Sequence, residues 1–210
     1  MIIAIDGPAA AGKGTLARKL ATEFNLAFLD TGALYRATGL RVMRNGTDLA
    51  DAQAVAAEAQ NITLEDRENP ALRDEATGDM ASKVSAIPEV RAALLDYQRN
   101  FATNPPEGFF GSILDGRDIG TVVCPNADAK IFVTASDEVR AHRRWLELSA
   151  KDNTVQEAVV LAEMQQRDAR DAARATAPMK AAEDAHLLDT SNLAIDAAFD
   201  AAKEFVSSKF

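Results

Sequence analysis

A lysine in a glycine-bounded loop near the start of the chain is the residue best suited to chemistry. The loop follows the apolar run of residues 1–6 and precedes a helical pattern of apolar residues. A strand, such a loop and a helix form the context of phosphate-binding loops. Backbone N–H groups around the loop and at the helix N-terminus bind anions, and Lys13 adds a mobile cation. We expect a nucleotide's phosphates to be held by Gly7, Pro8, Ala9, Ala10, Ala11, Gly12, Lys13, Gly14 and Thr15.

The loop departs from the general pattern, which places Ser or Thr directly after the lysine so that its hydroxyl reaches Mg²⁺. Here Gly14 lies between Lys13 and Thr15. Three interpretations stay open from the loop alone. It is a chance match, an ordinary strand-to-helix turn, or a subclass with different metal contacts.

Arginines are concentrated in the last third of this acidic chain. Phosphoryl transfer depends on positioning and on cations that meet the charge of the transferred group, and arginine binds phosphate bidentately. Arg167, Asp171 and Arg174 have helical spacing and would share one face. Alternatively, they form ion pairs on a solvated helix. The cluster comprises Arg140, Arg143, Arg144, Arg167, Arg170 and Arg174.

Two further arginines each follow a predicted strand by a few residues. Arg36 and Arg117 should therefore lie near the phosphate loop, although Arg36 could be a surface helix residue and Arg117 part of a structural ion pair. Nearby carboxylates, Asp30, Asp115 and Asp118, could hold Mg²⁺ through water or position these arginines. No set of residues has the spacing of a direct metal site, so we predict none.

The remaining reactive side chains lack partners at meaningful spacing. Cys124 lies in an apolar stretch and is expected to be a buried, unreactive hydrophobe. His142 and His186 have no serine, cysteine or metal-ligand partner nearby in sequence. We interpret all three as structural.

Composition narrows the classes of protein. The 210 residues are 47% hydrophobic and carry a formal net charge of −9, which argues against general binding to nucleic acid or anionic membranes. No apolar run approaches the ~20 residues of a membrane span, and no signal peptide is recognisable. One cysteine allows no internal disulfide and fits a reducing cytoplasm. We expect a cytoplasmic monomer.

Five apolar strand candidates alternate with helical patterns. This alternation is typical of an α/β fold with a five-stranded parallel sheet and helices on both faces. Residues 62–64 could add a short strand and 65–72 read as a loop, while Thr154 and Glu157 form a capping-box signature that opens a helix to about Ala173. The strand candidates are 1–6, 26–30, 109–115, 130–134 and 186–189.

Ligands of such sheets bind at the carboxyl ends of the strands. The phosphate loop, the segment 30–36 and the segment 115–118 each follow a strand. Charged groups therefore converge on one edge. Residues 60–90 and 150–178 do not fit the strand–helix rhythm and look like insertions over that edge.

Several motifs together resemble a known family. The chain contains Gly-Pro-Ala-Ala-Ala-Gly-Lys-Gly-Thr, Asp-Thr-Gly-Ala-Leu-Tyr-Arg, Asp-Gly-Arg-Asp-Ile-Gly-Thr-Val-Val, Arg-Ala-His-Arg-Arg and Arg-Asp-x-x-Asp-x-x-Arg in that order. Over nearly its whole length it resembles the bacterial cytidylate kinases, which are nucleoside monophosphate kinases of the P-loop class. The Lys-Gly-Thr order that departs from the general pattern is typical of such kinases.

The resemblance implies transfer of the γ-phosphoryl group of ATP to CMP or dCMP in pyrimidine nucleotide metabolism, with Mg²⁺ held mainly by phosphates and water. It also implies three parts. Residues 1–60, 91–150 and 179–210 would form the core, 61–90 a CMP-binding insert, and 151–178 a helical lid.

The resemblance also implies roles for single residues. Residues 7–15 would bind the ATP phosphates and Arg143 would stack on adenine, while Lys13, Arg117, Arg167 and Arg174 would carry catalysis. The CMP side would use Thr31, Arg36, Ser82, Arg91, Arg117, Asp118, Asp171 and Arg174, of which Arg36, Arg117 and Arg174 clamp the phosphate, Ser82 and Arg91 read cytosine, and Asp171 bonds the ribose.

Two departures from the family and two other functions stay open. Ala10 replaces a loop glycine, and its Cβ should restrict the backbone to negative φ. The stretch 62–72 is shorter than the family's insert, which leaves the strictness of CMP over UMP open. One alternative is a kinase for AMP, UMP or shikimate. The other is a nucleotide-dependent switch, although the chain lacks an Asn-Lys-x-Asp motif.

Overall fold

The computed structural model describes residues 1–210 and contains one five-stranded, all-parallel sheet. The strand order is β2-β3-β1-β4-β5, so the first strand lies at the centre. This confirms the α/β fold predicted from the sequence and all five strand candidates, although the third begins later than expected. The strands are β1 (Ile2–Asp6), β2 (Ala27–Asp30), β3 (Ser112–Asp115), β4 (Ala129–Thr134) and β5 (His186–Asp189).

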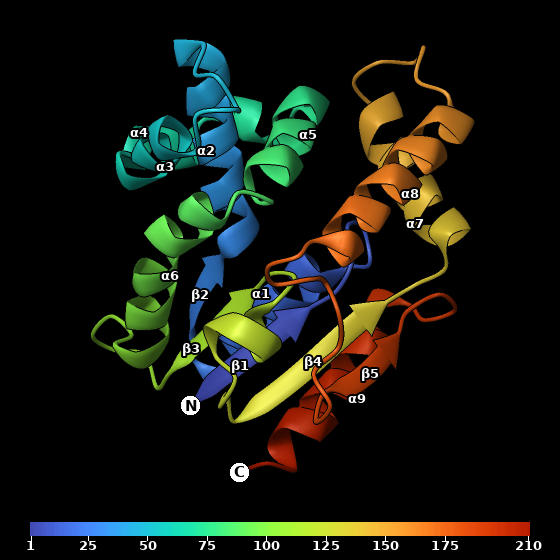
Figure 1. Cartoon of the computed structure of the whole chain (residues 1–210). Coiled ribbons are helices and arrows are strands. Elements are labelled where there is room, and N and C mark those ends of the chain that lie inside the picture. Colours follow the sequence, from blue (N-terminus) through green and yellow to red (C-terminus); the bar gives the residue numbers. More distant parts are fainter.

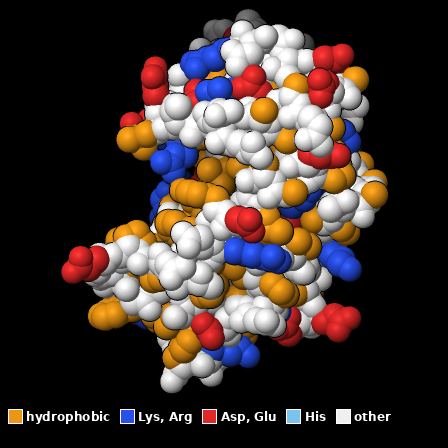
Figure 2. Space-filling model, turned by 60° about the vertical axis from the view of Figure 1, so that its left-hand side comes forward, with side chains coloured by type: hydrophobic (Ala, Val, Ile, Leu, Met, Phe, Trp, Pro, Cys, Tyr) orange, Lys and Arg blue, Asp and Glu red, His pale blue; other side chains and the backbone are white.

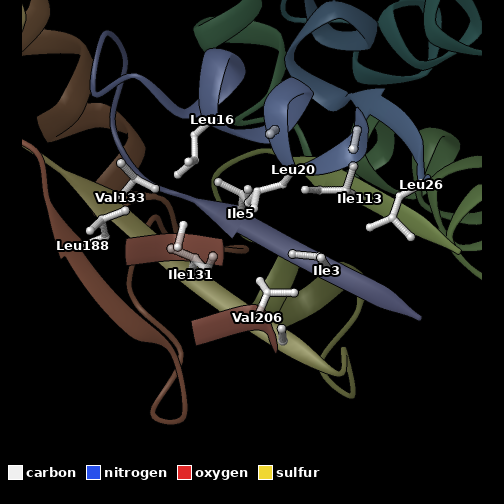
Figure 3. Packing of buried hydrophobic residues seen from close by; sticks show 14 of the residues in the cluster. Ile3, Ile5, Leu16, Leu20, Leu26, Ile113, Ile131, Val133, Leu188 and Val206 are labelled. Carbon is white, nitrogen blue, oxygen red and sulfur yellow. The ribbon is translucent and has the colours of Figure 1, made fainter. Parts of the chain in front are cut away.

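One face of the sheet packs against α1 (Lys13–Phe24) and α9 (Ile195–Ser207). Figure 3 shows Leu16 and Leu20 of α1 and Val206 of α9 among the isoleucines of the central strands. These side chains are almost fully buried. Removal of this apolar surface from water holds the helix that follows the phosphate loop on the sheet.

The other face packs against α6 (Pro88–Thr103) and a short helical turn, η2 (Ile119–Val123). Ala102 of α6 and Val123 of η2 join the buried Leu114 of β3 in one cluster. Cys124 belongs to the same cluster, and burial raises the pKa of its thiol to about 11. This confirms the predicted burial of the cysteine, and the raised pKa disfavours its thiolate form.

Two groups of helices extend beyond the carboxyl ends of the strands (Figure 1). In one group, α2 continues outward from the sheet and packs with its neighbours through an apolar cluster that includes Val42, Val55 and Val84. In the other, α7 and α8 share a cluster of Ala141, Val160 and Met164. The first group is α2 (Thr31–Asn45), α3 (Ala52–Gln60), α4 (Leu64–Glu68), η1 (Pro70–Arg73) and α5 (Glu75–Val84); the second is α7 (Asp137–Ser149) and α8 (Glu157–Ala173).

The stretch 62–73 is helical, so the predicted short strand at 62–64 and the loop at 65–72 are both wrong. Thr63 caps α4, since its side chain accepts from the Asp66 N–H while the Asp66 carboxylate accepts from the Thr63 N–H. This reciprocal capping satisfies donors that a helix start leaves unpaired. The capping favours a helix at this position over the strand propensity of residues 62–64.

The capping box predicted at Thr154 is also wrong. The Thr154 hydroxyl donates to Asp152 at 2.6 Å, and α8 begins at Glu157 after an N-cap at Gln156 without a side-chain cap. The Asp152 carboxylate therefore binds the Thr154 hydroxyl that would otherwise cap the helix. The helix itself ends at Ala173, as predicted.

The charges of the acidic chain are dispersed. Figure 2 shows Lys and Arg interspersed with Asp and Glu over the face that it presents. None of the helices is long and apolar enough to cross a membrane. The two histidines make structural contacts, His142 with Glu157 at 2.9 Å and His186 stacked on Phe205.

Candidate active site

The loop between β1 and α1 brings backbone and lysine together at the carboxyl end of the central strand. Gly7 adopts φ 137°, and a Cβ there would lie 1.9 Å from the Val133 carbonyl oxygen, so only glycine fits. Lys13 is the first residue of α1, and its ammonium donates to the Pro8 carbonyl at 2.7 Å. The strand, loop and helix predicted from the sequence are therefore present.

Ala10 overturns one expectation about this loop. Its φ is +56°, in the left-handed region that residues with a Cβ rarely adopt. The substitution of a loop glycine therefore does not restrict the backbone to negative φ. Ala10 also packs with Ala9 against the α7–α8 cluster, and this contact offsets part of the strain.

Burial and the neighbouring carboxylates act in opposite directions on the pKa of Lys13. Lys13 is 6% exposed, and burial lowers the pKa of its ammonium, helped by the guanidinium of Arg117. The carboxylates of Asp115 and Asp6 act in the opposite direction. An ammonium that is poorly solvated and repelled by a neighbouring cation is suited to a phosphate anion.

One cavity of about 620 Å³ opens over the carboxyl ends of the strands. It is lined by the loop and by segments from both groups of helices, which lie far apart in the sequence. Of the residues that the sequence assigned to the site, only Gly7 and Pro8 do not line it. Those that do are Ala9, Ala10, Ala11, Gly12, Lys13, Gly14, Thr15, Thr31, Arg36, Ser82, Arg91, Arg117, Asp118, Arg143, Arg167, Asp171 and Arg174.

A carboxylate at the centre of the cavity joins the two groups of helices. Asp171 of α8 accepts from the Ser82 hydroxyl of α5 at 3.1 Å. It forms ion pairs with Arg174 at 2.9 Å and Arg117 at 3.4 Å. Asp171 is 3% exposed, so these partners compensate a charge that would otherwise be costly to bury.

A second buried ion pair joins Arg91 of α6 to Asp118, which follows β3. Arg91 also donates to the Ser85 carbonyl at 3.3 Å and lies over the Tyr35 ring. The sequence assigned Arg91 and Asp118 to the same substrate, and the fold places them in contact. Tyr35 was not singled out, although it lies beside Arg36 in the second motif.

Three of the arginines that line the cavity retain buried donors without a hydrogen-bond partner, and Arg170, which does not line it, also has an unpaired Nε. The Nε atoms of Arg117, Arg167 and Arg174 are all in this state; the 3.4 Å ion pair of Arg117 Nε with Asp171 lacks hydrogen-bond geometry. Burial lowers the pKa of Arg167 to about 10, with repulsion from Arg117 and Arg36. Unpaired buried donors of one charge require an anion.

Other predicted residues have structural partners at the cavity wall. Arg36 donates to the Leu72 carbonyl at 2.8 Å, and the Thr31 hydroxyl donates to the Asp115 carbonyl at 2.8 Å. Arg143 donates to the Thr190 hydroxyl at 3.1 Å and carbonyl at 2.7 Å. These contacts orient the side chains that border the cavity.

The acidic residues near the loop do not form a direct metal site. No group of three or more His, Cys, Asp or Glu side chains is arranged to hold an ion. Asp30 caps α2 through the Ala33 N–H at 3.1 Å, and Asp118 pairs with Arg91. Asp115 is buried beside Lys13, and burial raises the pKa of its carboxyl.

Sequence reasoning assigned no role to the residues that support the site, although it counted Arg140 in the arginine cluster. Arg140 is buried and donates to the Ala9 carbonyl at 3.3 Å and to Asp168 at 2.6 Å, which ties the phosphate loop to α8. Glu75 and Asp79 of α5 pair with arginines of the opposite group of helices. The i, i+4 spacing of these two acids was the only available signal. Asp6 was also missed, because a single acidic residue at the end of a strand forms no sequence pattern that marks its role.

Comparison with known proteins gives consistent results. The family model described as cytidylate kinase matches residues 3–208. The cytidylate kinase of Rhodospirillum rubrum is 58% identical over 212 residues, covering 100% of this chain and 98% of that protein. That of Methylocella silvestris is 55% identical and covers 99% and 94%, respectively.

Solved structures support the fold alone, because their sequences are distant. An uncharacterized protein from Eubacterium ventriosum is similar with a TM-score of 0.57 at 15% identity, covering 99% of both chains. A sugar kinase from Janibacter is similar with a TM-score of 0.51 at 15% identity, covering 98% and 94%. The full-length match to the family model and to both bacterial enzymes shows that the chain belongs to the cytidylate kinase family.

Proposed function

We propose that this protein transfers the γ-phosphoryl group of ATP to CMP or dCMP, giving ADP and CDP or dCDP. The observation that carries the proposal is the convergence of Lys13 with Arg117, Arg167 and Arg174, whose buried Nε donors lack partners, on one cavity. Family membership adds independent support. Transfer between two phosphates needs cations in fixed positions, and this cavity offers them.

The donor side of the reaction is formed by residues 7–15. Backbone N–H groups of the loop bind the β- and γ-phosphates of ATP, and Lys13 neutralises charge on the γ-phosphoryl group during transfer. Arg143, held by Thr190 at the cavity wall, stacks on adenine. No protein nucleophile takes part, because the phosphate of CMP attacks directly.

The acceptor side uses both groups of helices. Arg36, Arg117 and Arg174 bind the CMP phosphate, with Thr31 and Asp118 beside it. Ser82 and Arg91 read the cytosine edge, and Asp171 bonds the ribose hydroxyls. The contacts of Asp171 with Ser82 and Arg174 support this role, since they group the residues for base, sugar and phosphate around one carboxylate. Arg167 meets charge on the transferred group.

Mg²⁺ fits the donor set on this edge. The Thr15 side chain and the carboxylates of Asp30 and Asp115 line the cavity, whereas no three acids converge. The ion would therefore be held by phosphates and waters, with Thr15 and the carboxylates placed to bond to those waters. The ion would neutralise the β- and γ-oxygens and leave the arginines to act on the acceptor side.

Three parts of the chain would divide the labour. Residues 61–90 serve as the CMP-binding insert and 151–178 as the lid, on a core of 1–60, 91–150 and 179–210. The ion pair between Asp79 of the insert and Arg170 of the lid supports this division, because it lies where closure over the nucleotides would occur. The small-molecule partners are ATP, CMP and dCMP, and the protein acts as a monomer.

A coupled assay of ADP release with a panel of monophosphates tests the proposal. CMP and dCMP should be phosphorylated with kcat/KM at least ~100-fold above UMP and AMP, because a site that bonds a base edge rejects analogues that leave those groups unpaired. No CDP above background would refute the proposal. Preferential turnover of AMP, UMP or shikimate would indicate another acceptor, and nucleotide binding without turnover would indicate a switch.

Two substitutions test the assigned cations. Lys13→Ala and Arg117→Ala should each lower kcat by about 100-fold or more, because each removes charge stabilisation of the transition state. Lys209→Ala is a matched control, since it removes a cation that lies over Phe205 at the C-terminus. Near wild-type kcat in a folded Lys13 or Arg117 variant would contradict that residue's role.

A further inference from the structure

Asp6, the last residue of β1, makes the most direct contact between the central strand and the turn after β3. Its Oδ1 accepts the Ile119 N–H at 2.7 Å, and its Oδ2 accepts the Gly120 N–H at 2.7 Å. The side chain is 5% exposed. Both donors come directly after Arg117 and Asp118, so the carboxylate holds the end of the segment that presents these two residues.

The other end of this segment is held by the same strand. The Gly116 N–H donates to the Ile5 carbonyl at 2.9 Å, and Ile5 is the register partner of Asp115. The segment is therefore fixed at both ends by two consecutive residues of β1. Asp6 is also bonded covalently to Gly7, the first residue of the phosphate loop, so it is common to both sides of the site.

The surroundings leave Asp6 little freedom. A Cβ added at Gly120 would lie 3.3 Å from Asp6 Oδ2 and 3.2 Å from Lys130 Cδ. The charged groups that act on the carboxylate are Lys13 from α1, which favours its ionised form, and Asp118 from the turn, which opposes it. On β4, the Lys130 ammonium is paired with Asp184.

We propose that Asp6 is a positioning residue that sets where Arg117 and Asp118 stand relative to the phosphate loop. The inference rests on the proposed function, because it assigns these two residues to the CMP side. Asp6 does not line the cavity and acts only through the backbone that it holds. Arg117 reaches Asp171, and Asp118 reaches Arg91, so a shift of the turn would disturb both contacts.

Asp6→Asn is the test, because the amide has nearly the same size but presents a donor to one of the two N–H groups. A buried N–H left without an acceptor is unfavourable and should displace the turn. We expect the KM for CMP to rise by about tenfold and kcat to fall by a similar factor, since a small misplacement of cations is costly to transfer. The KM for ATP should change by less than that for CMP, because the loop backbone is untouched and Asp115 remains to compensate the charge of Lys13.

Val123→Ala is the matched control. Val123 is a buried residue of η2 that packs behind the turn and does not contact Asp6 through a hydrogen bond. Its truncation should lower the midpoint of thermal unfolding while leaving the KM for CMP unchanged. If both variants raise the KM for CMP equally, or if Asp6→Asn raises the KM for ATP as much as that for CMP, the proposal is overturned.

Amide hydrogen exchange separates this inference from the proposed function. In Asp6→Asn the amides of Ile119 and Gly120 should exchange at least about tenfold faster than in the wild type, with or without nucleotide. Failure of the wild type to form CDP would refute the proposed function and leave this readout valid. Unchanged exchange at both amides would overturn the anchoring role whatever the activity.

Discussion

Ala10 shows how a single residue stores backbone strain in the phosphate loop. It keeps a Cβ at φ +56°, a conformation that glycine adopts without steric cost. Replacement by glycine removes this strain but adds freedom to the unfolded chain and loses a methyl contact with the α7–α8 cluster. We expect Ala10→Gly to change the free energy of unfolding by no more than about 1 kcal/mol, in the stabilising direction, measured by urea denaturation.

The neighbouring alanine is the control for this prediction. Ala9 packs against the same cluster but does not have a positive φ. Ala9→Gly should therefore destabilise the protein by about 0.5–1 kcal/mol, because the added freedom and the lost methyl contact are not offset by any relief of strain. Equal losses of stability in the two variants would show that Ala10 is not strained.

The ionisation of Asp6 predicts a pH dependence of stability. Burial raises the pKa of its carboxyl from 3.8 to about 7, in spite of the two backbone hydrogen bonds. Between these values the folded state keeps a proton that the unfolded chain has released, so stability falls as pH rises through the window. The loss from this group alone is up to about 4 kcal/mol and is complete just above pH 7.

Urea unfolding of the wild type and Asp6→Asn at several pH values isolates this effect, because the amide does not titrate. The free energy of unfolding of the wild type minus that of the variant should decrease from about pH 4 to pH 7 and then become constant. A difference that increases with pH would mean that the hydrogen bonds lower the pKa of Asp6 instead.

Predicting individual residues worked where a backbone pattern defines their surroundings. The loop lysine, Arg36 and Arg117 were placed near one edge because each follows a strand of a parallel sheet. Contacts such as Arg140 with Ala9 join residues 131 positions apart, and no local pattern encodes them. The paired state of Asp171 likewise depends on how two groups of helices meet.

At the scale of elements, helix α5 lies against the arginines at the cavity wall. A Cβ added at Gly78 would lie 3.1 Å from Arg36 Nη1 and 3.5 Å from Arg167 Nη1. Both are ends of flexible side chains, so Gly78→Ala should displace the guanidinium groups and keep the fold. We expect the KM for CMP to rise by about three- to tenfold with unchanged or higher stability, because alanine favours helix.

Gly39 of α2 is the matched helical glycine. A Cβ there would lie 3.0 Å from the Ala81 backbone nitrogen and 3.1 Å from the Met80 side chain. Gly39→Ala should therefore lower the free energy of unfolding by about 1–3 kcal/mol, because the α2–α5 contact must open. A change of stability in Gly78→Ala as large as in Gly39→Ala would contradict the distinction between flexible and rigid neighbours.

Two ion pairs, which we call the clasp, join α5 to the opposite group of helices. Glu75 pairs with Arg144 of α7 at 2.7 Å, and Asp79 pairs with Arg170 of α8 at 2.6 Å. These side chains are partly exposed, so each pair contributes at most about 1 kcal/mol. The double variant Glu75→Gln/Asp79→Asn should raise the KM for CMP by about two- to fivefold and reduce the dependence of that KM on salt.

Asp196→Asn is the control for the clasp. Asp196 pairs with Lys19 on the surface of α1 and α9, so its neutralisation leaves α5, α7 and α8 untouched. Steady-state kinetics from low to high salt should not distinguish this variant from the wild type. A double variant whose salt dependence equals that of the wild type would show that the clasp does not contribute to binding.

Elements were predictable to the extent that their signals are local and long enough. Each of the five strands is an apolar run bounded by polar residues, and Pro88 correctly predicted the start of α6. The stretch 62–73 was wrong because two side-chain caps, at Thr63 and Asn69, start short helices. The capping pattern at Thr154 was wrong because Asp152 takes its hydroxyl. Side-chain hydrogen bonds between residues close in sequence therefore determine helix boundaries that hydrophobic periodicity does not predict.

At the scale of the molecule, the site is assembled from segments that only the sheet brings together. β1 and β3 are neighbours although more than a hundred residues separate them in the chain, and β1 carries both the phosphate loop and the anchor of the turn after β3. The two groups of helices meet over this edge through Asp171 and the clasp. The donor side and the acceptor side of the cavity are therefore both anchored on the central strand β1.

This arrangement predicts which parts of the molecule nucleotides will stabilise. A non-hydrolysable ATP analogue with CMP should slow amide hydrogen exchange in α5 and α8, because residues of both helices line the cavity. At concentrations about 100-fold above the dissociation constants, each ligand can stabilise the bound state by about 2.7 kcal/mol. Exchange in these helices should be slowed most when both ligands are present, since each side closes the same cavity.

Helix α3 is the internal reference for this measurement, because none of its residues lines the cavity. Its amides should respond only through the global stability of the protein, and less than those of α5 and α8 at early exchange times. Uniform protection of α3, α5 and α8 would mean that the ligands stabilise the fold as a whole and do not close the two groups of helices on each other. Protection of α8 by the ATP analogue alone, with no further effect of CMP, would exclude α8 from the acceptor side.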